Sequence, residues 1–167
     1  QTDAVLSQSK GPNALSAALT AIEQGDFQAV SDLVKLTDNA EMKTLIRWSK
    51  LRAGVGEWSE YRAFLSDHPD WPGLQRLRRQ AEAKLPADTP NTIQAFFADR
   101  TPETPAGALL LLSVKPQKEL LISAWTDMSL TEIEQQTFLD RFGETLAPYH
   151  IERLDNLLWR KLRTQAG

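Results

Sequence analysis

The stretch DNAEMKTLIRWSKLRAGVGEWSEYRAFLSDHPDWPGLQRLRRQAEAKL, residues 38–85, decides the fold of this chain. In three helix-length segments apolar residues recur every three or four positions, and breaks rich in Gly, Pro and Asp separate the segments. Their apolar faces are Met42, Leu45, Ile46 and Ser49; Trp58, Tyr61, Phe64 and Leu65; and Leu74, Leu77, Ala81 and Leu85. The stretch predicts stacked helices and shows no set of catalytic residues.

Start and stop signals divide the rest of the chain into further helices. Gly25 and Gly143 are predicted to end helices, because glycine readily adopts the left-handed conformation found there. Capping hydroxyls, carboxylates and prolines predict helix starts at Asp26, Asp38 with Glu41, Thr89-Pro90, Thr104-Pro105, Pro116, Ser129 with Glu132, and Pro148. The last segment carries Ile151, Leu154, Leu157 and Leu158 at helical spacing, followed by Trp159.

These segments predict an all-α fold without a sheet. About nine helices with short connections favour antiparallel neighbours. Hairpins of roughly 25 to 35 residues are typical of helical repeats, so we expect an α-superhelix, or solenoid, of helix hairpins in preference to a compact bundle. Residues 1–12 are expected to form a flexible arm, and residues 13–167 a single superhelical domain.

Composition narrows the classes of function. The chain has 167 residues and a formal net charge of −3, with 19 basic and 22 acidic residues mixed along it, which argues against nucleic acid as a partner. It has no cysteine, so thiolate metal sites and cysteine nucleophiles are excluded. The longest apolar run, 108–112, is far shorter than the roughly 20 residues of a membrane-spanning helix. We expect no membrane span.

The carboxylates and histidines do not form a recognisable reaction centre. The densest acidic cluster is Glu57, Glu60, Asp67 and Asp70, and caps or solvated helix faces account for it. The two histidines, His68 and His150, are far apart in the sequence, whereas a stable metal site needs three or four ligands. We therefore predict no catalytic residue, no metal and no cofactor in this chain.

Two kinds of residue remain as candidates for weak binding contacts. Arg76, Arg78 and Arg79 form either a solvated face, in which Arg79 pairs with Glu82 or Glu41, or a basic patch that meets an anionic ligand or another domain. The cations of the last helix, Arg153, Arg160, Lys161 and Arg163, admit the same two interpretations. The five tryptophans are Trp48, Trp58, Trp71, Trp125 and Trp159, and core packing is the simpler interpretation of each.

Trp71 is the tryptophan that we expect to be most exposed, because it lies in a turn rich in proline. It can equally act as a staple that seats this turn on the preceding helix. The candidate contacts with glycan or with another domain are therefore Trp71, Arg76 and Arg79.

Four segments, in this order, resemble the soluble lytic transglycosylases of Gram-negative bacteria. They are the run from Trp58 to Glu82, TPAGALLLL at 104–112, ISAW at 122–125, and FLDRFGETLAPYHIERLDNLLWR at 138–160, which is the most specific. The similarity covers about residues 38–160 and is to the N-terminal superhelical region of that family.

The resemblance implies a periplasmic protein whose parent enzyme cleaves the bond between N-acetylmuramic acid and N-acetylglucosamine in peptidoglycan and leaves 1,6-anhydro ends. The family's catalytic glutamate lies in a Glu-Ser motif of a C-terminal lysozyme-like domain, and this chain contains no such motif. We therefore expect an inactive fragment of a longer protein whose signal peptide is removed or lies outside the sequence. Its expected partners are glycan strands and the catalytic domain of the same chain.

A stand-alone helical-repeat adaptor that binds a protein partner is the alternative from another class of function. Its concave surface would then hold a protein and not a polysaccharide.

Overall fold

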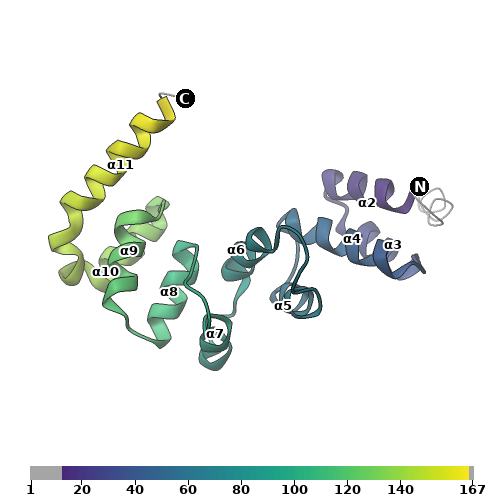
Figure 1. Cartoon of the computed structure of the whole chain (residues 1–167), viewed down its shortest axis with the longest axis horizontal. Helices are drawn as coiled ribbons and strands as arrows, with labels where there is room; N and C mark the ends of the chain where they lie inside the picture. The colour runs from purple at the N-terminus through teal and green to yellow at the C-terminus, as the bar shows by residue number, and fades with distance from the viewer. Residues whose placement is uncertain (1–12, 166–167) are drawn as a thin grey trace. The chain divides into compact units, whose positions relative to one another are not determined.

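The computed structural model describes residues 13–165, in which every regular element is a helix and no strand is present (Figure 1). The predicted all-α class is therefore confirmed. The helices are α2 (Asn13–Gln24), α3 (Phe27–Leu36), α4 (Ala40–Arg52), α5 (Trp58–Asp67), α6 (Leu74–Lys84), α7 (Pro90–Phe96), α8 (Pro105–Val114), α9 (Lys118–Asp127), α10 (Glu132–Leu146), the 3₁₀ turn η1 (Ala147–Tyr149) and α11 (His150–Gln165).

The chain divides into two compact units, residues 1–81 and 82–167. The continuous superhelix over residues 13–167 stays a prediction. The predicted arm, residues 1–12, lies outside the described range. Among the described helices, none combines the length and the apolar character that crossing a membrane requires.

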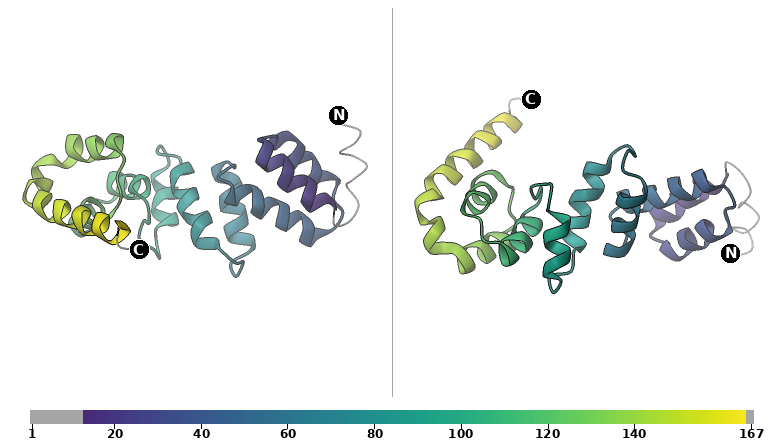
Figure 2. Two further views of the ribbon diagram at one scale, coloured as in Figure 1. Left: turned by 90° about the horizontal axis from the view of Figure 1, so that it is seen from above. Right: turned by 60° about the horizontal axis from the view of Figure 1, so that its bottom comes forward.

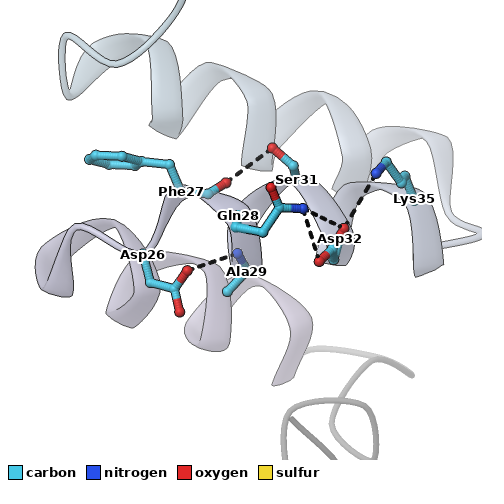
Figure 3. Close-up of polar contacts among 7 residues, drawn as sticks. All are labelled: Asp26, Phe27, Gln28, Ala29, Ser31, Asp32 and Lys35. Carbon is cyan, nitrogen blue, oxygen red and sulfur yellow. Dashed lines mark hydrogen bonds and ion pairs between the residues drawn. The ribbon is translucent and has the colours of Figure 1, made fainter.

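The core of the first unit begins with α2, α3 and α4, which pack through small and branched side chains. Its buried residues are Ala18, Ala21, Val30, Leu33 and Ile46. Gly25 ends α2 with a φ of 73°, as predicted. Asp26 caps α3 by accepting a hydrogen bond from the N–H of Ala29 at 3.0 Å (Figure 3). The two helices therefore form a hairpin with almost no loop.

The exposed side of α3 is held by polar contacts within the helix. Asp32 accepts from the side-chain amide of Gln28, one turn earlier, and pairs with Lys35 at 3.3 Å (Figure 3). Such pairs at a spacing of three or four residues stabilise a helix by a few tenths of a kcal/mol. They leave the opposite side of α3 free to form the core.

The three predicted helices of residues 38–85 are all present as α4, α5 and α6. Leu74, Leu77, Ala81 and Leu85 are all buried, as their spacing predicts. Tyr61 ties α5 to the end of α4, because its hydroxyl donates to the carbonyl of Leu51 at 2.9 Å. Burial raises the pKa of this hydroxyl to about 12.

Several of the predicted boundaries are wrong in detail. Helix α9 begins at Lys118 and not at Pro116, and Pro148 lies in η1, ahead of α11. Asn39 caps α4 in place of Asp38, and its side chain accepts from the N–H of Met42 at 2.9 Å. Thr131 caps α10 in place of Ser129, with Glu134 as the reciprocal partner. At both of these caps a neighbouring side chain with the same capping chemistry takes the position. Gly143 does not end α10, because the helix continues through it to Leu146.

The second unit has a buried carboxylate at the start of α8. Glu82 is only 2% exposed and accepts from the backbone N–H groups of Glu103 and Thr104, at 2.9 and 2.8 Å, and from the Thr104 hydroxyl. These donors lie at the N-terminus of α8, where unpaired N–H groups favour an anion. Gly107 leaves space for the carboxylate, because a Cβ there would lie 2.8 Å from the Glu82 carboxyl carbon.

The last helix packs on the C-terminus of α9 through its polar side. Arg153 donates to the Trp125 carbonyl, Asn156 donates to the Thr126 carbonyl at 3.3 Å, and Arg160 donates to the Asp127 carbonyl. These are carbonyls that the end of a helix leaves without partners of its own. Side chains at positions 153, 156 and 160 lie on one side of α11, so this side is fixed against α9.

The apolar residues of α11 are consequently exposed. Ile151, Leu154, Leu157 and Leu158 all lie on the surface, and Trp159 is exposed as well. The last turns of α11 extend beyond the other helices of the second unit (Figure 1 and the right view of Figure 2). The interpretation of Trp159 as a core residue is therefore wrong, whereas Trp125 is buried as predicted.

Candidate functional site

Trp71 belongs to the packing of a turn and is not the most exposed tryptophan. It is only partly exposed, and its ring lies 5.4 Å from that of His68 and 6.0 Å from that of Phe64, between ring centres. Both partners belong to the end of α5. Trp71 therefore seats the proline-rich turn on the preceding helix, as the staple alternative predicts, and Trp159 is more exposed.

Trp48 holds the other side of the same turn. Its indole N–H donates to the carbonyl of Pro72 at 3.0 Å, and Gly73 next to it has a φ of 73°. The Arg52 guanidinium lies over the Trp48 ring, with its central carbon 4.5 Å from the ring centre. A cation over an indole face is attracted by the electrons of the ring. Trp48 and Arg52 are four residues apart on α4, so the helix itself brings them together.

A shallow groove of about 390 Å³ runs beside this pair, and Arg76 at the start of α6 forms part of its wall. We call it the Trp48 groove. Its lining residues are Leu15, Leu19, Leu45, Trp48, Ser49, Arg52, Ala53 and Arg76. No Asp or Glu belongs to this set, so the two guanidinium groups give the groove a positive charge beside an apolar wall. Such a surface suits a ligand that has both a carboxylate and an apolar face.

The three predicted contact residues are not brought together. Arg76 lies in the Trp48 groove, Trp71 packs on α5, and Arg79 is exposed on α6 outside the set that lines the groove. Sequence reasoning missed Trp48 and Arg52 as members of the site. Their spacing of four residues, which places an indole and a guanidinium side by side on a helix, was the signal that could have indicated them.

A second pocket, of about 290 Å³, lies between α4 and α5 and contains groups of both charges. Lys50 and Glu60 form an ion pair across it at 2.6 Å. Burial acts to raise the pKa of the Glu60 carboxyl, but hydrogen bonds from Lys50 and from the N–H of Glu57 outweigh it, and the pKa lies below its usual value. Glu60 is therefore ionised at neutral pH and already neutralised by Lys50. This pocket offers less net charge to an anionic ligand.

The carboxylates of the predicted acidic cluster are exposed, in agreement with caps and solvated faces. Glu57, Glu60, Asp67 and Asp70 all lie on the surface. Among the described residues, no group of three or more His, Asp or Glu side chains could hold a metal ion.

Glu82 differs from these carboxylates, because its burial contradicts the expectation of a surface position. Its oxygens accept from Glu103 and Thr104 at the start of α8. It borders neither of the two pockets described above, so its visible role is to cap a helix.

Comparisons with known proteins found no relative of this chain. No family model matches the chain, and neither a curated protein nor a solved structure matches it.

Proposed function

We propose that this chain is the non-catalytic superhelical region of a periplasmic soluble lytic transglycosylase, and that its Trp48 groove holds glycan strands of peptidoglycan. The sequence resemblance over residues 38–160 supports this proposal, and an all-helical fold is what the resemblance implies. Docking of the parent enzyme's catalytic domain is the second part of the same role.

The composition of the Trp48 groove is the observation that carries the proposal. Peptidoglycan presents acetylated sugar rings, whose C–H faces are apolar, and peptide stems with free carboxylates. Arg52 and Arg76 offer two cations to a carboxylate, while Leu19, Leu45 and Trp48 offer apolar surface to a ring. Without an acidic side chain in its lining, the groove does not repel an anionic strand.

Cosedimentation with purified peptidoglycan sacculi tests the binding role. The full chain is expected to sediment with sacculi, and Arg76→Gln is expected to bind at least about tenfold more weakly, in line with the roughly 1.5–3 kcal/mol of a hydrogen bond to a charged group. Arg62→Gln is the matched control, because Arg62 is also an exposed arginine of the first unit but lies outside the groove. Failure of the unsubstituted chain to bind sacculi, or an equal loss of binding in both variants, would contradict the glycan-binding role.

The same sacculi test the absence of catalysis. Because no side chain corresponds to the family's catalytic glutamate, we expect the chain to release no 1,6-anhydromuropeptides. Release of such products by purified chain would show that it is itself the enzyme.

The adaptor alternative has one observation in its favour, which is the exposed apolar face of α11. Apolar surface of this kind is typical of sites of protein association. A chain that does not bind sacculi but associates through α11 would support the adaptor.

A further inference from the structure

The pocket between α4 and α5, which we call the α4–α5 pocket, separates its charges by helix. Its arginine and its lysine, Arg47 and Lys50, both belong to α4, and its two carboxylates, Glu60 and Asp67, both belong to α5. A spacing of three residues places the two cations on the same side of α4, and a spacing of seven places the two anions about two turns apart on one side of α5. The pocket therefore has one cationic wall and one anionic wall.

Only one pair of these charges is neutralised across the pocket. The Lys50 ammonium lies 2.6 Å from a carboxylate oxygen of Glu60. Neither Arg47 nor Asp67 forms an ion pair with any residue in the described part of the chain, although both line the same cavity. A guanidinium on one wall and a carboxylate on the other are thus left for a ligand, while the Lys50–Glu60 pair connects the two walls.

The inner surface of the α4–α5 pocket is apolar. Leu51 and Phe64 line it and are only 2% and 4% exposed, and Ala63 adds a methyl group. His68 also lines the pocket and packs its ring against Phe64, with 4.7 Å between the ring centres. The volume of about 290 Å³ is at the small end of the range for ligand pockets. A matching ligand is therefore small, with an apolar part for this surface and charged groups for the walls.

We propose that the α4–α5 pocket binds a free α-amino acid with an apolar side chain, in its zwitterionic form. The guanidinium of Arg47 donates paired, charge-assisted hydrogen bonds to the ligand carboxylate. The carboxylate of Asp67 accepts from the ligand ammonium, and Leu51 and Phe64 contact the ligand side chain. A simple anion would leave Asp67 without a partner, and a simple cation would leave Arg47 without one. This site is distinct from the Trp48 groove, and the proposal is independent of the glycan-binding role.

Titration of the isotope-labelled full chain with L-leucine, followed by amide NMR spectra, tests the proposal. Amide signals of α4 and α5 around the pocket are expected to shift in a saturable way, with a dissociation constant on the order of 1 mM. N-acetyl-L-leucine lacks the ammonium and L-leucinamide lacks the carboxylate, so each is expected to bind at least about fivefold more weakly. Absence of a saturable shift, or equal binding of either derivative, would overturn the proposal.

Substitutions on the two walls assign the two ends of the ligand. Arg47→Gln is expected to weaken the binding of leucine about fivefold and to leave that of leucinamide unchanged, because this probe has no carboxylate. Asp67→Asn is expected to weaken the binding of leucine similarly and to leave that of N-acetyl-leucine unchanged.

Arg62→Gln and Asp70→Asn are the matched controls, because both residues are exposed and lie outside the pocket lining. The amide spectra also verify that each variant is folded. A control that loses leucine binding as strongly as the wall variants would refute the proposed site. So would a wall variant that weakens the derivative without the matching charge as much as it weakens leucine.

Discussion

At the scale of single residues, the position of the Glu82 carboxylate requires that residue 107 has no side chain. The carboxylate of Glu82 occupies the space that a side chain at Gly107 would take, and it binds the first N–H groups of α8. Gly107 has no unusual φ, so this glycine is required by space and not by backbone conformation.

Gly107→Ala is therefore expected to destabilise the protein by about 2 kcal/mol, although alanine normally favours a helix over glycine. The new methyl group would displace the Glu82 carboxylate and leave the partly buried N–H groups of Glu103 and Thr104 without this acceptor. Urea unfolding followed by circular dichroism measures the change. Gly143→Ala is the control, because Gly143 also lies within a helix but a Cβ there meets nothing within 4 Å. It is expected to stabilise by about 0.5 to 1 kcal/mol, and destabilisation in both variants would contradict the explanation.

The burial of Glu82 also predicts a pH dependence. Burial raises the pKa of its carboxyl above the ordinary value of 4.5, despite the hydrogen bonds from Thr104 and Glu103 that lower it. The folded protein then holds this proton more tightly than the unfolded chain. Its contribution to the free energy of unfolding is fully present below about pH 4.5 and is lost as the pH rises through the folded-state pKa.

We expect the free energy of unfolding of the unsubstituted protein, relative to that of Glu82→Gln, to fall as the pH rises from 4.5 to neutrality. The slope is limited to about 1.4 kcal/mol per pH unit for a single group. Urea unfolding of both proteins at several pH values gives the difference, in which all other titrating groups cancel. A difference that grows with pH would mean that the hydrogen bonds outweigh the burial.

At the scale of elements, α11 caps α9. Arg153 and Arg160 supply positive charge and N–H donors to the C-terminus of α9, where the helix dipole is negative. Burial lowers the pKa of Arg153, and the nearby Arg160 lowers it further. The two arginines that the sequence left open between a solvated face and a binding patch are therefore structural, at least in their contacts with α9.

Arg153→Met is expected to destabilise the protein by about 2 kcal/mol, because it removes a charged donor from a buried carbonyl but retains much of the side-chain volume. Chemical unfolding provides the measurement. Arg141→Met is a suitable control, because Arg141 also lies near an aromatic ring, at 5.1 Å from Phe142, but is exposed. Equal effects of the two substitutions would assign the stability to side-chain packing over the ring and not to capping.

The elements show how far sequence reasoning reaches. Spacing predicted the apolar side of α6 well, because Leu74, Leu77, Ala81 and Leu85 are all buried, but it gave no sign that Glu82 of the same helix is buried too. The same rule applied to α11 would bury its leucines, but three polar side chains bind the end of α9 and turn them outward. Helix periodicity identifies a face, whereas the position of a neighbouring helix end decides which face packs.

The prediction of the candidate site had the same limit, because the sequence indicates single residues but not which of them come together. Arg76 was predictable as a cation beside the central turn, but its relation to Trp48 depends on the hydrogen bond between the indole and the Pro72 carbonyl, 24 positions away. Trp71 was expected outside because prolines surround it, yet Phe64 and His68 provide aromatic surface for it. The contact of Trp48 with Pro72 joins residues distant in the sequence and carries no local signal, whereas Trp71 packs on residues only three and seven positions before it.

At the scale of the whole molecule, two units account for the described helices. α6 begins in the first unit and ends in the second, since the division falls between Ala81 and Glu82. Ala81 packs in the core while Glu82, the next residue, binds the start of α8. The Trp48 groove belongs to the first unit, and the exposed apolar residues of α11 belong to the second.

The exposure of Trp159 allows tryptophan fluorescence to report on the surface of the second unit. Trp159 is 63% exposed on α11, whereas Trp125, the other tryptophan of this unit, is buried. A soluble quencher therefore reaches Trp159 far more readily than Trp125, and a partner that covered Trp159 would shield it from the quencher and shift its emission to shorter wavelength. The last helix thus carries, in its own sequence, a fluorophore that registers contact at its exposed surface.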